Sequence, residues 1–174
     1  TPAKADLWPA SRCEADGMTA EAITLGEGGI LDLDAVMHIM DDSFDPMFGE
    51  AWTAPQCAGL LRMPGVWLTL AHQDGEIVGF SLARVVVKEA ELLLLAVKKG
   101  SQRNGVGRTL LGGFVDAAAS RGGDRMHLEV RDGNQAINLY LKAGFTEVGR
   151  RRNYYTGRNG KLFDALTLAK KTNL

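Results

Sequence analysis

The sequence predicts an α/β domain of the α+β type, in which a mixed, mostly antiparallel sheet is flanked by helices. Three observations predict this fold. Residues 31–63 show helical spacing of apolar residues, residues 66–97 hold three successive strand-like segments, and residues 105–168 alternate strands with helices before a last strand pair. A meander followed by strand–helix units is typical of helices layered on one sheet.

An opening strand and two helices are expected before the hairpin. The strand is expected at residues 22–25. The second of the two helices is expected from about residue 54 to 63, because Thr53 and Gln56 have capping-box spacing and Pro64 ends the pattern. The first helix is expected where apolar residues recur at helical spacing: Leu31, Val36, Ile39 and Met40.

The period then changes to that of strands. Residues 66–71 and 76–87 alternate around the turn signal Asp74-Gly75, which predicts a hairpin. Residues 91–97 form a short continuous apolar run. Such a run is typical of a strand that is buried on both faces.

The second half predicts two helices and three more strands. Strands are expected at residues 126–130, 145–149 and 163–168, with a helix at 135–142 and a long hairpin joining the last two strands. The preceding helix is predicted by apolar residues at every fourth position: Val106, Leu110, Phe114 and Ala118.

Length and composition fit one globular domain. Residues 1–17 mix Pro, Ala, Asp and Arg without periodicity, so we expect a flexible arm there. We expect a single domain at 18–174, since 45% of the 174 residues are hydrophobic. Cys13 and Cys57 lack metal or disulfide spacing. The longest apolar run has six residues (92–97), far short of a membrane span. We therefore expect a cytoplasmic protein, as a monomer or weak homodimer, with no metal and no membrane partner.

The charges are unevenly divided along the chain. Residues 1–97 carry five basic and fifteen acidic side chains, whereas residues 98–174 carry fifteen basic and six acidic ones. This division favours an anionic partner for the second half and a cationic one for the first, unless the charges only solvate the surface. Direct nucleic-acid binding is not expected, because the whole chain has no positive excess.

A glycine-bearing loop joins the third strand of the meander to the following helix. Gly105 and Gly107 let an anion approach the free N–H groups at the helix start, and Arg103 and Arg108 add positive charge. The dinucleotide-binding motif does not fit, because Leu110 occupies the position of its third glycine. The phosphate loop of nucleotide hydrolases does not fit either, because Val106 occupies the position of its lysine. The loop predicts a diphosphate site; the alternative is a helix that begins with glycines for structural reasons.

Gln102-x-x-Gly105-x-Gly107, after a strand ending in Ala96-Val97, resembles the acetyl-coenzyme A loop of the GNAT superfamily of N-acetyltransferases. The resemblance covers roughly residues 22–170 and implies the GNAT fold with a splayed pair of cofactor-binding strands. A second block that resembles this family comprises Leu128-Glu129-Val130-Arg131, Asn134, Leu139-Tyr140 and Gly144-Phe145. Further segments resemble its bacterial branch that acetylates the N-terminal alanine of a ribosomal protein: Arg152-Asn153-Tyr154-Tyr155 and Asp164-Ala165-Leu166.

The resemblance implies acetyl-coenzyme A as co-substrate. The cofactor-binding asparagine of the family matches Asn134. The segment between Arg131 and Tyr140 that contains it is one residue shorter than the common spacing. The cofactor-binding residues that it implies are Leu95, Ala96, Val97, Gln102, Arg103, Asn104, Gly105, Val106, Gly107, Arg108, Thr109 and Asn134.

Two residues are implied as proton carriers. The resemblance assigns Glu129 as general base, acting through water, and Tyr140 as the acid that reprotonates the coenzyme thiolate. Alternation places Glu129 and His127 on the same strand face, so His127, or water alone, is a rival base. A structural reading pairs Glu129 with Arg131 or another cation and packs Tyr140 against the sheet.

The acceptor is expected to be a protein or peptide N-terminus, with a ribosomal protein as the implied case. An α-amine has a pKa near 7.7–8.0 against about 10.4 for lysine, so one glutamate suffices to deprotonate it. Phe44, Tyr154 and Tyr155 are the candidate acceptor-binding residues. A small-molecule or lysine acetyltransferase, and a non-catalytic acetyl-coenzyme A sensor, are the alternatives.

Overall fold

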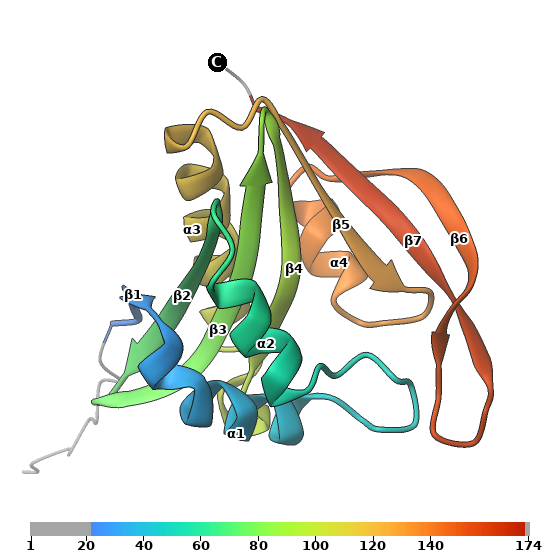
Figure 1. Cartoon of the computed structure of the whole chain (residues 1–174), viewed down its shortest axis with the longest axis horizontal. Coiled ribbons are helices and arrows are strands. Elements are labelled where there is room, and N and C mark those ends of the chain that lie inside the picture. Colours follow the sequence, from blue (N-terminus) through green and yellow to red (C-terminus); the bar gives the residue numbers. More distant parts are fainter. Residues whose placement is uncertain (1–21, 173–174) are drawn as a thin grey trace, which may run out of the picture.

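The computed structural model describes residues 22–172, so the expected arm at residues 1–17 lies outside the described part. Seven strands form one sheet in the order β1-β2-β3-β4-β5-β7-β6 (Figure 1). The strands are β1 (Thr24–Gly28), β2 (Val66–Gln73), β3 (Glu76–Val86), β4 (Glu89–Val97), β5 (Arg125–Arg131), β6 (Thr146–Thr156) and β7 (Leu162–Lys171). The helices are α1 (Leu33–Ser43), α2 (Ala54–Leu61), α3 (Val106–Ser120) and α4 (Ile137–Lys142), with short 3-10 turns at Ile30–Asp32 and Lys99–Ser101.

The pairing confirms the predicted mixed, mostly antiparallel sheet. Only β4 and β5 run parallel among the described strand pairs. The β2–β3 turn has positive φ at both Asp74 and Gly75, as the predicted Asp-Gly hairpin requires. Leu92 pairs with Ala83 and Leu94 with Leu82, so Leu93 is an extra residue that bulges from β4.

Helices cover both faces of the sheet. Helices α1 and α2 pack on one face with Phe80 and Leu94, and α3 and α4 pack on the other with Leu92 and Leu128 (Figure 1). The continuous apolar run of β4 is therefore buried on both sides, as predicted. Within residues 22–172, no helix combines the length and the apolar character needed to cross a membrane.

Some predicted boundaries and faces are wrong. Leu31 is 95% exposed, because it belongs to the 3-10 turn before α1 and not to the buried stripe of that helix. The expected strand at residues 145–149 is instead β6, which continues to Thr156. Pairs such as Arg150–Leu166 and Thr156–Leu162 extend its ladder past two irregularities. This pairing is long-range, and exposed arginines give no local strand signal.

The sheet opens between β4 and β5. These strands pair from Glu89–Arg125 to Leu92–Leu128 and no further in the described ladder. Beyond that point, residues 93–97 and 129–131 diverge, and Figure 1 shows the two strands spreading towards the loop between α1 and α2. This is the splayed strand pair that the family resemblance implied, and it positions the candidate site.

Candidate active site

A cavity of about 760 Å³, here called the donor cleft, lies at the splayed end of β4. It is lined by the end of β4, the loop before α3, the start of α4 and the segment between α1 and α2. Nine of the predicted cofactor-binding residues line it: Leu95, Ala96, Val97, Gln102, Arg103, Gly105, Gly107, Arg108 and Asn134. The other three are Asn104, Val106 and Thr109. Of these, Val106 is buried in the core and the Thr109 hydroxyl donates to the Gly105 carbonyl at 3.1 Å.

The backbone at the start of α3 is open to a ligand. Gly105 has φ +90°, a conformation that other residues adopt only with strain, and it comes directly before the first helical residue. A Cβ on Gly107 would lie 3.3 Å from Leu139 Cδ2. The glycines therefore let the chain turn into α3 while its first N–H groups stay uncovered by side chains.

The β4 edge that faces the splay presents main-chain groups. The Lys98 N–H donates to the Val78 carbonyl, so ladder alternation turns the peptide groups of Leu95 and Val97 away from β3, towards the open side. The Val97 carbonyl accepts hydrogen bonds from Ser43 Oγ and Gln102 Nε2, both at 3.0 Å. The Gln102 side chain thus fixes the strand end, and the N–H and C=O of Leu95 face the cleft edge.

A second cavity of about 290 Å³, here called the acceptor cavity, adjoins the donor cleft. The predicted base, acid and acceptor-binding residues all line it: Phe44, Glu129, Tyr140, Tyr154 and Tyr155. Five residues line both cavities: Phe44, Glu50, Leu95, Asn134 and Ala136. The splayed strands therefore separate two half-sites that meet at Leu95.

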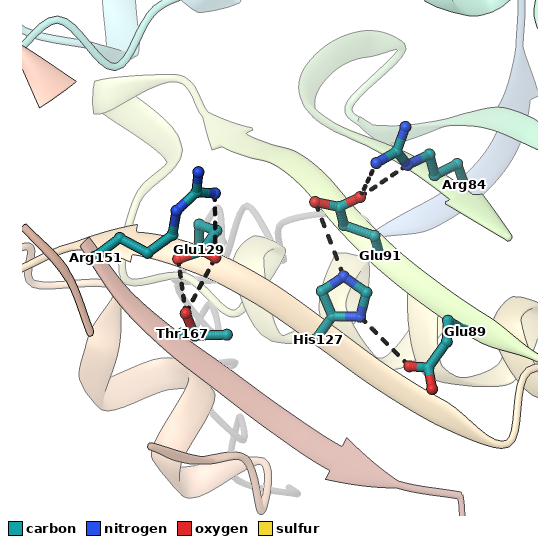
Figure 2. A network of polar contacts seen from close by, with 7 residues as sticks. All are labelled: Arg84, Glu89, Glu91, His127, Glu129, Arg151 and Thr167. Atoms are coloured by element: carbon teal, nitrogen blue, oxygen red, sulfur yellow. Dashed lines mark hydrogen bonds and ion pairs between the residues drawn. The ribbon is translucent and has the colours of Figure 1, made fainter. Parts of the chain in front are cut away.

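Glu129 lies on β5 (Figure 2), and its side chain is 16% exposed. The Thr167 hydroxyl lies 3.0 Å from both carboxylate oxygens, and Arg151 Nη1 lies 3.7 Å from Oε1. The cation beside Glu129 is thus Arg151 and not Arg131. Both neighbours leave the carboxylate at the wall of the acceptor cavity.

His127 shares the strand face of Glu129 but has different neighbours. Its ring nitrogens lie 3.8 Å from Glu89 Oε2 and 3.9 Å from Glu91 Oε1, and Glu91 is also paired with Arg84 (Figure 2). His127 is not among the residues that line the donor cleft or the acceptor cavity. This arrangement favours Glu129 as the base.

Tyr140 is 6% exposed and packs edge-to-face against Phe145, so it serves the core as well as the cavity. Burial, followed by the negative charge of Glu50, raises the pKa of Tyr140 above its ordinary value. The same two causes, in the same order, lead the rise in the pKa of Tyr155. Both phenols therefore keep their protons to a higher pH than a free tyrosine, which makes them weaker acids. The predicted acid role of Tyr140 rests on its place in the wall of the acceptor cavity.

Two residues of the site were missed by the sequence reasoning. Glu50 and Arg131 form an ion pair at 3.3 Å, with side chains only 9% and 11% exposed. Asn134 Nδ2 also donates to Glu50 Oε1 at 2.9 Å. Glu50 lies in an irregular segment without periodicity, so no local pattern indicates that it is buried.

The fold and the two cavities define an α+β domain with a helix layer on each face of the sheet and two adjoining cavities where β4 and β5 splay apart. The chain belongs to the acetyltransferase (GNAT) family, whose model matches residues 33–145. The predicted family and fold are thus confirmed.

Several proteins similar to this chain are N-acetyltransferases with the same named acceptor. The ribosomal protein bS18-alanine N-acetyltransferase of Escherichia coli K12 is 42% identical over 98 residues, which cover 56% of this chain and 66% of that protein, just under two thirds. The enzyme of the same name from Haemophilus ducreyi is 33% identical over 138 residues, covering 75% of this chain and 95% of that one. The crystal structure of the Escherichia coli ribosomal-protein-S18-alanine N-acetyltransferase superposes with a TM-score of 0.78 at 32% identity, covering 88% of this chain and 96% of that chain.

Proposed function

We propose that this chain transfers the acetyl group of acetyl-coenzyme A to the α-amino group at the N-terminus of a protein, by direct attack in a ternary complex. The observation that carries the proposal is the meeting of the donor cleft with the acceptor cavity at the splayed strands. Two reactants held on either side of Leu95 would react as if in one molecule, which is a large source of rate enhancement.

Acetyl-coenzyme A suits the donor cleft. GNAT acetyltransferases use it, and the cleft offers the start of α3 together with Arg103 and Arg108 for a diphosphate. The peptide groups of Leu95 at the strand edge suit an extended pantetheine arm. A donated N–H near the thioester carbonyl would stabilise the oxyanion that develops there.

Each proton has a candidate carrier. The acceptor amine reacts in its neutral form, so an ammonium ion first loses a proton to solvent. The nitrogen then attacks the thioester carbonyl, and Glu129 takes, through water, the proton that this nitrogen must lose as the C–N bond forms. As the tetrahedral intermediate collapses, the new C–N bond remains and the C–S bond breaks. Tyr140 gives its proton to the leaving thiolate. Both side chains line the acceptor cavity, which supports these roles.

The acceptor that fits best is a protein N-terminus, for which Phe44, Tyr154 and Tyr155 form part of the cavity wall. The relatives named above act on ribosomal protein bS18, and we extend this to a ribosomal protein as acceptor here. The acidic first half of the chain favours such a basic partner. This acceptor fits a cytoplasmic enzyme that works as a monomer or weak homodimer.

The test is acetylation of a peptide library read by mass spectrometry. The protein and acetyl-coenzyme A are incubated with peptides that begin with alanine, the same peptides with a blocked N-terminus, and peptides with an internal lysine. We expect transfer to the free α-amine and none to the blocked peptide. Faster transfer to lysine or to a polyamine would overturn the assignment of the acceptor.

A further inference from the structure

A buried carboxylate that the proposed chemistry does not use lies where the two cavities meet. Glu50 comes from the segment between α1 and α2, and its side chain is 9% exposed. It lines both the donor cleft and the acceptor cavity. Because an unpaired buried charge is strongly unfavourable, the partners of this carboxylate show what it holds in place.

The partners of Glu50 belong to the two elements that carry the proton-handling residues. Arg131, whose Nε lies 3.3 Å from Glu50 Oε2, ends β5 two residues after Glu129. Asn134 donates to Glu50 Oε1 at 2.9 Å, and its own Oδ1 accepts from the Ala136 N–H at 2.9 Å, directly before α4. Glu50 therefore joins the end of the strand that carries the base to the start of the helix that carries the acid.

The charge of Glu50 also acts on both half-sites. Arg131 lines the donor cleft, where its positive charge is balanced by Glu50. On the other side, the carboxylate is the leading charged group among those that raise the pKa of Tyr155, so its field reaches the acceptor cavity. An acceptor α-amine arrives mainly as an ammonium ion near pH 7, and a negative cavity favours it.

We infer that Glu50 is a positioning residue for acetyl transfer: it fixes the start of α4 through Asn134, balances Arg131 in the donor cleft and keeps the acceptor cavity negative. This inference rests on the proposed function. The charge of Glu50 distinguishes this positioning role from a merely structural one. Removing only the charge should weaken binding of the acceptor without weakening binding of acetyl-coenzyme A, because the donor cleft then becomes more positive.

The test compares Glu50→Gln with Glu50→Ala. The glutamine oxygen can still accept from Asn134, so we expect the KM for an alanine-initiated peptide to rise about tenfold while the Kd of acetyl-coenzyme A stays equal or falls. Glu50→Ala also frees Asn134, so we expect it to weaken acetyl-coenzyme A binding and lower kcat as well. Glu27→Gln, at an exposed position of β1 outside both cavities, is the matched control.

The contrary outcomes are distinct. Glu50→Gln kinetics equal to the wild type would overturn the inference, as would a loss of acetyl-coenzyme A affinity in that variant that parallels its loss of acceptor affinity. A lower thermal stability of Glu50→Gln is expected in either case, because the buried Arg131 charge loses its partner. A wild-type protein that acetylates no α-amine would instead refute the proposed function. In that case calorimetry with acetyl-coenzyme A still tests the link through Asn134: equal affinities of Glu50→Gln and Glu50→Ala would refute it.

Discussion

Glu129 is held without being neutralised by a buried partner. The Thr167 hydroxyl can donate to only one of the two oxygens at a time, although it lies 3.0 Å from both. The Arg151 side chain is 56% exposed and also stacks on Tyr154, so its ion pair contributes at most about 1 kcal/mol. Arg151 can therefore move aside at little cost, which would leave Glu129 oriented by Thr167 at the cavity wall, as its proposed role as the base requires.

The first prediction concerns this carboxylate. Glu129→Gln keeps an oxygen for Thr167 but cannot accept the proton of the amine, so we expect kcat to fall by about 10²- to 10⁴-fold. The affinity for acetyl-coenzyme A, measured by calorimetry, should be unchanged. Glu147→Gln, at an exposed position of β6, is the control. Wild-type turnover in Glu129→Gln would show that another group, or water alone, is the base.

A second prediction concerns stability at high pH. Burial and the charge of Glu50 raise the pKa of Tyr140 and Tyr155, whereas both phenols ionise near pH 10 in the unfolded chain. Unfolding therefore releases protons above about pH 10. The stabilising contribution is complete below that pH and is lost as the pH rises towards the folded-state pKa.

Thermal unfolding checks this prediction. Between about pH 9 and 11, we expect the Tm of Tyr155→Phe to fall less than that of the wild type, since the variant lacks one partly buried phenol whose pKa is raised. Tyr154→Phe, at the more exposed neighbour, serves as the control. Equal slopes for the wild type and Tyr155→Phe would contradict the role assigned to burial.

At the scale of elements, the site depends on how β4 leaves the sheet and how α3 begins. The glycine-bearing start of α3 is a local pattern that the sequence shows directly, and the continuous apolar run predicts only that β4 is buried on both faces. The splay of β4 was implied by the resemblance to the GNAT family. The sequence could not predict the Glu50–Asn134 contact, which joins residues 84 positions apart through an irregular segment. Nor could it predict that Gln102 binds the Val97 carbonyl, since the type of side chain does not specify its partner.

The third prediction tests the start of α3. Gly105→Ala places a side chain at φ +90°, so we expect it to cost about 1 kcal/mol of unfolding free energy and to weaken acetyl-coenzyme A binding. Gly112→Ala, within α3 where a new Cβ meets open space, should instead gain about 0.5–1 kcal/mol and leave binding unchanged. Urea unfolding and calorimetry measure both effects. If Gly105→Ala binds acetyl-coenzyme A with wild-type affinity, the loop before α3 does not bind the coenzyme, and the prediction is wrong.

At the scale of the whole molecule, the sheet separates two layers of helices and is open between the ends of β4 and β5. Helices α1 and α2 cover one face and α3 and α4 the other (Figure 1). Residues of β4 line both cavities, and residues at the end of β5 line each of them. Five residues are shared by the linings, so the two cavities adjoin, as the proposed ternary complex requires. The unequal charge of the two halves of the chain suits an anionic donor and a cationic acceptor.

The fourth prediction follows from these adjoining cavities. Direct attack requires both substrates to be bound, so initial-velocity lines at several acetyl-coenzyme A concentrations should intersect. Mass spectrometry of the protein after incubation with acetyl-coenzyme A alone should show no added acetyl group. Parallel lines together with an acetylated protein would indicate a covalent intermediate and contradict the ternary complex.

The central claim is tested most directly by a crystal structure of the protein with coenzyme A and an alanine-initiated peptide. We predict the diphosphate on the main-chain N–H groups between Gln102 and Thr109, the thiol end beside Leu95, and the peptide amine in the cavity that holds Glu129 and Tyr140. A coenzyme bound away from the donor cleft, or a peptide amine on the far side of the sheet from Glu129, would contradict the account.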